Sequence, residues 1–350
     1  MIGADAVVRA IKKLGTDHVF GIISIHNMPI FDAINRDGKI RIIDCRHEMA
    51  ATHAADGYAR ATGKIGVAIA STGPGTTNTV TGLYEAHYAS SPVLLITGQA
   101  ETSFYGKAQG YVHEAEQQLP MLETVTRRTE SISAADEIEA AILEVAAEIS
   151  NGRPSSGAIE IPIDLQYAKV TPSDQELRVI ETELPAIDAA IELIEATQRR
   201  IIIAGGGVIS SGAVNDLVTL AENLGAPLFT THNGRGAIPE DHPLCVGNLY
   251  QAKSMHSAMI QADLTIAIGT RFQVGVGGSG ANLRPAGKLL HIDIDADMIN
   301  RVHPADLSLI GDARSLLQAI THAKNYETGD SGFTTQVLDA ADGLKQHLRS

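Results

Sequence analysis

Short apolar runs alternate with helically spaced apolar residues along the first half of the chain. Such runs predict buried strands at residues 19–23, 40–44, 66–71, 92–97 and 158–161. Apolar residues three and four positions apart predict helices at 3–14, 29–35, 47–62, 76–90 and 136–149. Strands that alternate with helices over short loops predict an α/β fold, with a mainly parallel sheet covered on both faces.

The same alternation resumes after a polar segment at 169–185, which contains Pro172 and Pro185 and shows little periodicity. Strands are predicted at 200–204, 227–230, 262–269 and 289–293, with helices at 187–197 and 213–224. The tail from 325 predicts a loop and a weak helix. We therefore expect two doubly wound domains, at 1–168 and 186–325, joined by a linker at 169–185 and followed by a tail at 326–350.

Composition narrows the class of protein. The 350 residues are 44% hydrophobic and 19% charged, which suffices for two cores. A net charge of -14 repels phosphate backbones, so we expect no nucleic-acid partner. No apolar stretch reaches membrane-spanning length, and the start shows no secretory leader pattern. Cys45 and Cys245 are far apart and predict free thiols, so a cytoplasmic protein is expected.

Two polar motifs follow neighbouring apolar runs. Residues 46–51 read RHEMAA, and residues 71–78 read STGPGTTN. Glu48 lies in the first turn of a helix, where the macrodipole alone favours a carboxylate. It is also placed to exchange a proton with a ligand nitrogen. A metal is not expected, because a His-Glu-x-x-His zinc helix would need histidine where Ala51 stands.

Other candidate features allow a structural and a functional interpretation. The turn at Gly73, Pro74 and Gly75 is either a plain turn or exposes N–H groups to a ligand. His26 follows a strand end and either packs structurally or reaches the cleft of Glu48. The glycines at 205–207 match a dinucleotide fingerprint poorly and favour close packing, and the loop at 275–280 is expected to be solvated. No serine elbow supports a hydrolase.

Taken together, the motifs resemble the acetolactate synthase and benzaldehyde lyase group of thiamine-diphosphate enzymes. Residues 46–60 are similar to the helix that carries the activating glutamate, and residues 71–78 and 92–99 to the loop and strand that follow. Residues 152–154 and 159–164 resemble the end of that pyrimidine-binding domain. Residues 204–208, 234–239, 269–272 and 291–295 resemble the central domain, which binds FAD or another adenine nucleotide in some members.

The resemblance implies a thiamine-diphosphate-dependent decarboxylase or carboligase that acts on a small 2-oxo acid or aldehyde. It makes Glu48 the acid that activates the cofactor and places His26 and His113 on the substrate side. The cofactor-binding residues it implies are Glu48, Thr72, Gly73, Pro74, Gly75 and Asn78. A homo-oligomer, a dimer or tetramer, is expected because the family forms its site between subunits.

Three departures from the family pattern limit this interpretation. Residues 112–114 read VHE where many acetolactate synthases have Phe-Gln-Glu, and residues 24–27 read SIHN without Pro-Gly-Gly. The magnesium-binding diphosphate domain has no match, so we expect it to come from outside this sequence or from another chain, and the chain alone to be inactive. The alternatives are an inactive paralogue that keeps the fold as a nucleotide-binding or interaction module and, more weakly, a NAD-dependent oxidoreductase.

Overall fold

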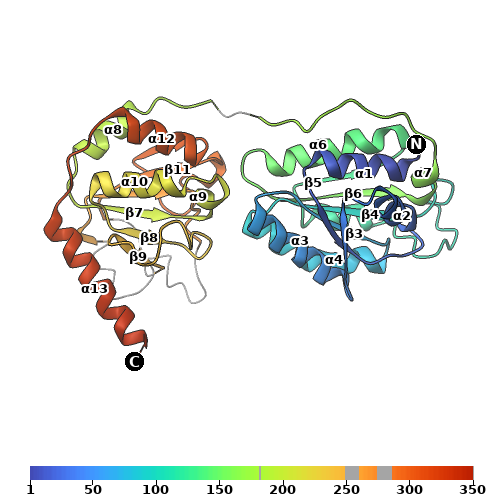
Figure 1. Cartoon of the computed structure of the whole chain (residues 1–350), viewed down its shortest axis with the longest axis horizontal. Coiled ribbons are helices and arrows are strands. Elements are labelled where there is room, and N and C mark those ends of the chain that lie inside the picture. Colours follow the sequence, from blue (N-terminus) through green and yellow to red (C-terminus); the bar gives the residue numbers. More distant parts are fainter. Residues whose placement is uncertain (181–182, 249–259, 274–285, 350) are drawn as a thin grey trace. The chain divides into compact units, whose positions relative to one another are not determined.

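Two parallel sheets organise the chain, one in residues 1–180 and one in residues 181–350 (Figure 1). The computed structural model describes residues 1–180, 183–248, 260–273 and 286–349. Within these ranges each unit has a six-stranded sheet with helices on both faces. The predicted α/β class is therefore confirmed.

Unit 1 has the strand order β2-β1-β3-β4-β6-β5, with all neighbours parallel. Its strands are β1 (His18–Gly21), β2 (Arg41–Asp44), β3 (Gly66–Ala70), β4 (Val93–Gln99), β5 (Arg128–Ser131) and β6 (Ser156–Pro162). Its helices are α1 (Gly3–Lys13), α2 (Met28–Asp37), α3 (Glu48–Thr62), α4 (Pro74–Ala89), α5 (Gln118–Glu123), α6 (Ile138–Ser150) and α7 (Ile163–Tyr167), with a 3₁₀ turn η1 (Ala135–Glu137).

The two faces of this sheet bury different helices (Figure 1). Helices α1, α2 and α6 pack on one face through aliphatic side chains such as Ile11, Ile34 and Ile142. Helices α3 and α4 cover the other face with smaller residues, including Ala51 and Ala55. These two helices approach closely, because a Cβ at Gly82 would lie 2.0 Å from Thr52 Oγ1.

Unit 2 has the order β12-β11-β10-β7-β8-β9, again with all neighbours parallel. Its strands are β7 (Arg200–Ala204), β8 (Leu228–Thr230), β9 (Cys245–Gly247), β10 (Leu264–Ile268), β11 (Lys288–Asp293) and β12 (Leu307–Ile310). Its helices are α8 (Asp188–Glu195), α9 (Gly206–Ser210), α10 (Val214–Leu224), α12 (Ala313–Ala323) and α13 (Ser331–Arg349), with a 3₁₀ turn η3 (Ala296–Met298).

The structure adds elements that the hydrophobic pattern does not predict. Strands β5, β9 and β12 each lie at the edge of a sheet, where few buried apolar side chains are needed. The weak helix expected in the tail is the long helix α13. Its residues Phe333, Val337 and Ala341 are buried against the sheet of unit 2.

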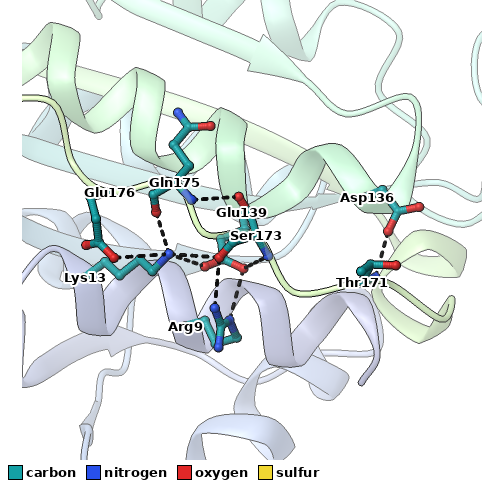
Figure 2. Close-up of polar contacts among 8 residues, drawn as sticks. All are labelled: Arg9, Lys13, Asp136, Glu139, Thr171, Ser173, Gln175 and Glu176. Atoms are coloured by element: carbon teal, nitrogen blue, oxygen red, sulfur yellow. Dashed lines mark hydrogen bonds and ion pairs between the residues drawn. The ribbon is translucent and has the colours of Figure 1, made fainter.

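Residues 171–180 form a segment that we call the strap, and polar contacts tie it to unit 1 (Figure 2). Ser173 makes several of these contacts, and its carbonyl accepts from Arg9 Nη2 at 2.9 Å and from Lys13 Nζ at 3.1 Å. Its N–H donates to Glu139 Oε2 at 3.2 Å. Further along, Ile180 N donates to Asn151 Oδ1 at 2.7 Å. The first part of the predicted linker is therefore held along α1 and α6.

Candidate active site

The carboxyl edge of the unit 1 sheet gathers the polar motifs. Strands β1 and β3 are neighbours, yet β1 leads to β2 on one side and β3 leads to β4 on the other. Such a switch point is where open α/β sheets bind ligands. Here His26, which follows β1, lies beside Ser71, which follows β3: His26 Nδ1 and Ser71 Oγ are 3.4 Å apart.

Glu48 begins α3 after the edge strand β2. His47 caps the helix, since its Nδ1 accepts from Met49 N at 3.1 Å. Asn78 Nδ2, from α4, donates to Glu48 Oε2 at 2.9 Å. Glu48 Oε1 accepts no hydrogen bond from the described residues and would lie 3.4 Å from a Cβ at Gly75. The carboxylate is thus held by one oxygen and presents the other beside the glycine turn.

The glycine turn is fixed by its own contacts. Gly73 has a φ of 59°, and a Cβ there would lie 2.7 Å from the His113 carbonyl oxygen. Its N–H donates to Gln118 Oε1 at 2.9 Å, while Gly75 N donates to Thr72 O at 3.3 Å. Protein oxygens already accept from the N–H groups of Gly73 and Gly75, which favours the interpretation as a plain turn. Glycine is required here for close approach.

His26 is buried, with 1% of its surface exposed, and a hydrogen bond holds its backbone. Its carbonyl accepts from Gln166 Nε2 at 2.8 Å, and its ring lies 5.9 Å from the ring of His113. Burial, together with the nearby His113, lowers the pKa of His26 below its usual value, although a backbone hydrogen bond with Val112 opposes the shift. The imidazole is therefore neutral at pH 7, and it can accept a proton or a hydrogen bond.

His113 has an exposed side chain on the segment between β4 and α5. Its φ of 60° is uncommon for a residue with a side chain. Its carbonyl accepts from Thr72 Oγ1 at 3.4 Å, so its backbone is held against the glycine turn. The structure thus brings His26, His113 and the turn together, and Glu48 Oε1 lies beside Gly75 in the same turn.

A hollow of about 630 Å³ opens beside these groups. Gly73 and Thr77 line one side, and residues between Ala108 and Met121 line the other. The hydrophobic pattern does not predict this segment, which has long stretches without regular structure. This segment forms a long connection between β4 and α5 beside the glycine turn.

Sequence reasoning missed a buried carboxylate next to this hollow. Glu160 on β6 is fully buried and accepts hydrogen bonds from four side chains. The donors are Tyr105, Ser131, Gln99 and Gln118. The sequence did contain a signal for this group, because Glu160 interrupts the apolar run at 158–161. A carboxylate buried in a strand requires hydrogen-bond partners.

In unit 2 the glycines after β7 serve packing, as the sequence favours. A Cβ at Gly205 would lie 2.0 Å from Gly269 O, and Gly207 N donates to that oxygen at 3.0 Å. The loop at 275–280, which the sequence analysis expects to be solvated, lies outside the described residues.

Comparison with known families identifies both units. Residues 1–141 match the model of the N-terminal TPP binding domain of thiamine pyrophosphate enzymes, and residues 187–320 match the central domain of these enzymes. The chain belongs to the thiamine pyrophosphate enzymes. Glu48, His26, His113 and the glycine turn all fall within the part that matches the thiamine pyrophosphate enzyme N-terminal domain.

Proteins named as acetolactate synthase large subunits resemble the chain along most of its length. The probable acetolactate synthase large subunit of Methanocaldococcus jannaschii is 35% identical over 336 residues, which cover 92% of this chain and 56% of the relative. The acetolactate synthase large subunit of Corynebacterium glutamicum is 33% identical over 354 residues, covering 99% and 56%. The chain thus spans somewhat more than half the length of these relatives.

Two kinds of feature are absent from the part of the chain that the structure describes. In the described ranges, no three His, Cys, Asp or Glu side chains come together in a way that could hold a metal ion. None of the helices described there has the length and apolar character needed to span a bilayer.

Proposed function

We propose that this chain supplies the pyrimidine-binding and central domains of a thiamine-diphosphate-dependent decarboxylase or carboligase acting on a small 2-oxo acid or aldehyde. The observation that carries the proposal is the Glu48 carboxylate, whose Oε1 accepts no hydrogen bond from the described residues beside Gly75. The acetolactate synthase relatives support C–C bond chemistry, and the N-terminal domain match supports the cofactor.

The residues present fit the aminopyrimidine of the cofactor. Glu48 Oε1 would hold a proton at a pyrimidine ring nitrogen, while Asn78 keeps Oε2 in place. Thr72, Gly73, Pro74 and Gly75 would supply shape, since the N–H groups of both glycines are already bonded. When bound, thiamine diphosphate supplies a carbon nucleophile for the carbonyl substrate and an electron sink for the bond that breaks.

His26 and His113 form the proposed substrate side. The low pKa of His26, caused first by burial, keeps its ring neutral and able to accept a proton. The exposed His113 ring, 5.9 Å away, could donate one. Where the substrate carbonyl lies between them, these rings would move protons to and from its oxygen.

Further binding partners complete the proposal. We expect magnesium and the diphosphate to be held by another domain, in the same polypeptide or on a second chain, as the resemblance implies. We also expect the chain to self-associate through α3 and α4, where Met49 and Tyr84 are 39% and 54% exposed. For the central domain, FAD or another adenine nucleotide is the ligand to test, by flavin absorbance and nucleotide calorimetry.

The test replaces Glu48 with glutamine in the enzyme complemented by a diphosphate-binding domain. Exchange of the cofactor's acidic C–H, followed by NMR, should slow by about 10²- to 10⁴-fold while the fold is kept. The matched control is Glu85→Gln, a carboxylate on α4 that contacts Arg60 at 3.4 Å and not the turn. Wild-type exchange in the Glu48 variant would refute the proposal. No binding of thiamine diphosphate with magnesium by the complemented chain would favour an inactive paralogue.

A further inference from the structure

The carboxylate of Glu160 is the centre of a buried polar network in unit 1. Its Oε1 accepts from Tyr105 Oη and Ser131 Oγ, both at 2.8 Å. Its Oε2 accepts from Gln118 Nε2 at 2.9 Å and from Gln99 Nε2 at 3.3 Å. No Lys, Arg or His side chain among the described residues forms an ion pair with it, so neutral donors stabilise this buried group.

The network fixes the orientation of the Gln118 amide. An ionised carboxylate only accepts hydrogen bonds, so the side that faces Glu160 must be the NH₂ group of Gln118. The same NH₂ group also donates to Gly98 O at 3.2 Å. The amide oxygen therefore points the other way, where it accepts from Gly73 N at 2.9 Å and from Thr72 Oγ1 at 3.1 Å.

The hydrogen bond from Gly73 N to Gln118 Oε1 holds the glycine turn at Gly73, where the backbone is most closely packed. Gly73 has a left-handed backbone, and its Cα packs against the carbonyl of His113. Two residues later, Gly75 lies next to Glu48 Oε1. A rotation of the turn at Gly73 would therefore change the space beside the Glu48 carboxylate.

We propose that Glu160 is a positioning residue that, through the Gln118 amide, sets the conformation of the Gly73 turn and hence the fit of the aminopyrimidine beside Glu48. The effect on the fit of the aminopyrimidine rests on the proposed function, whereas the link from Glu160 to Gly73 does not. Glu160 is fully buried and does not line the hollow, so it would act through Gln118, which is 2% exposed and lies in the lining.

The first experiment measures the turn in the 350-residue chain, by NMR of the Gly73 amide and its hydrogen exchange. Gln118→Met removes the acceptor, and Glu160→Leu removes the group that orients it. Both should speed exchange at Gly73 by about tenfold or more. Ser131→Ala is the matched control, because it removes a donor to Glu160 Oε1 and leaves the Gln118 bond. It should leave Gly73 unchanged.

The conservative variant Glu160→Gln separates positioning from charge. Its oxygen can still face Gln118 while its NH₂ faces Tyr105 and Ser131, whose hydroxyl oxygens can accept. It should therefore restore slow exchange at Gly73. If Glu160→Leu does not fold, Gln118→Met and Glu160→Gln carry the test.

The second experiment measures the complemented enzyme. Gln118→Met should raise the KM for thiamine diphosphate about tenfold with a smaller change in kcat at saturation, since the turn acts on cofactor fit. Unchanged Gly73 exchange in Gln118→Met would overturn the positioning role. So would equally faster exchange throughout unit 1 in every variant, Ser131→Ala included. If the wild-type enzyme binds no cofactor, the proposed function fails, and the Gly73 measurement still decides the link to Glu160.

Discussion

Replacement of Glu139 by alanine should loosen the strap and destabilise unit 1. The Glu139 side chain is 2% exposed and lies 3.1 Å from Arg9 Nε and 3.0 Å from Lys13 Nζ (Figure 2). It also accepts from the N–H of Ser173 in the strap. The variant thus removes one buried anion that is shared by α1, α6 and the strap.

The loss of stability in Glu139→Ala depends on how exposed its two cationic partners are to water. Breaking a buried ion pair costs about 3–5 kcal/mol when the surviving charge stays buried. Here Arg9 and Lys13 are 38% and 15% exposed, so both cations can reach water. We therefore expect the free energy of unfolding to fall by about 2–3 kcal/mol. The control Glu176→Ala should change it by about 0.5 kcal/mol or less, because that side chain is 76% exposed and 3.7 Å from Lys13.

The dependence on pH gives a second check. Burial alone raises the pKa of Glu139, but hydrogen bonds from Lys13, Arg9 and Ser173 outweigh it and lower the pKa below the usual 4.5. A carboxyl group whose pKa is lowered in the folded state stabilises the fold at every pH above its usual pKa. This contribution is lost as the pH falls through the lowered pKa. The difference between Glu139→Ala and wild type should therefore be largest near neutral pH and shrink in acid.

The assay combines urea unfolding with limited proteolysis. Urea curves at neutral and acid pH measure the difference in stability, and mass spectrometry locates the first cut. In the wild type we expect cleavage after residue 180, because contacts hold residues 171–180. In Glu139→Ala we expect new cuts within 171–176. Equal stability of Glu139→Ala and Glu176→Ala, with no new cuts, would refute the reasoning.

Three further predictions concern the candidate site and the assembly. His26→Ala and His113→Ala should each reduce turnover or change the products of the complemented enzyme; unaltered kinetics and products would make them structural histidines. Gly75→Ala should raise the KM for thiamine diphosphate, because the new Cβ would lie 2.8 Å from Ser71 Cβ. The comparison variant Gly57→Ala has open space around its Cβ and should instead stabilise the chain by about 0.5–1 kcal/mol. The 350-residue chain alone should bind the cofactor weakly by calorimetry and self-associate in ultracentrifugation; a tight complex with turnover, or a strictly monomeric mass at high concentration, would contradict these two expectations respectively.

The buried strands were predictable because short apolar runs between turn residues are typical of strands buried on both faces. Strands β3, β4 and β6 are covered on both faces, and their runs of aliphatic residues predict this burial. The edge strand β5, with the sequence RTES, is only partly buried at every position. Its place in the sheet comes from pairing with β6, which no local pattern encodes.

The candidate site divides in the same way. Glu48 and the glycine turn stand in contiguous motifs, so the sequence indicates them. The Glu160 network joins residues 99, 105, 118, 131 and 160, which are brought together only by the fold. The commitment of the Gly73 N–H to Gln118 is equally a tertiary fact. Sequence reasoning therefore finds a candidate reactive group more readily than the residues that orient it.

The beginning of unit 1 and its exit segment lie side by side. Ile2 and Lys169 form an antiparallel bridge, and Val170 N donates to Met1 O at 3.1 Å. A short peptide could therefore join the two ends without disturbing the sheet. New ends could then be opened at the exposed, left-handed Gly63 between α3 and β3. Unit 1 is in this respect a closed module suited to circular permutation and to grafting into another chain.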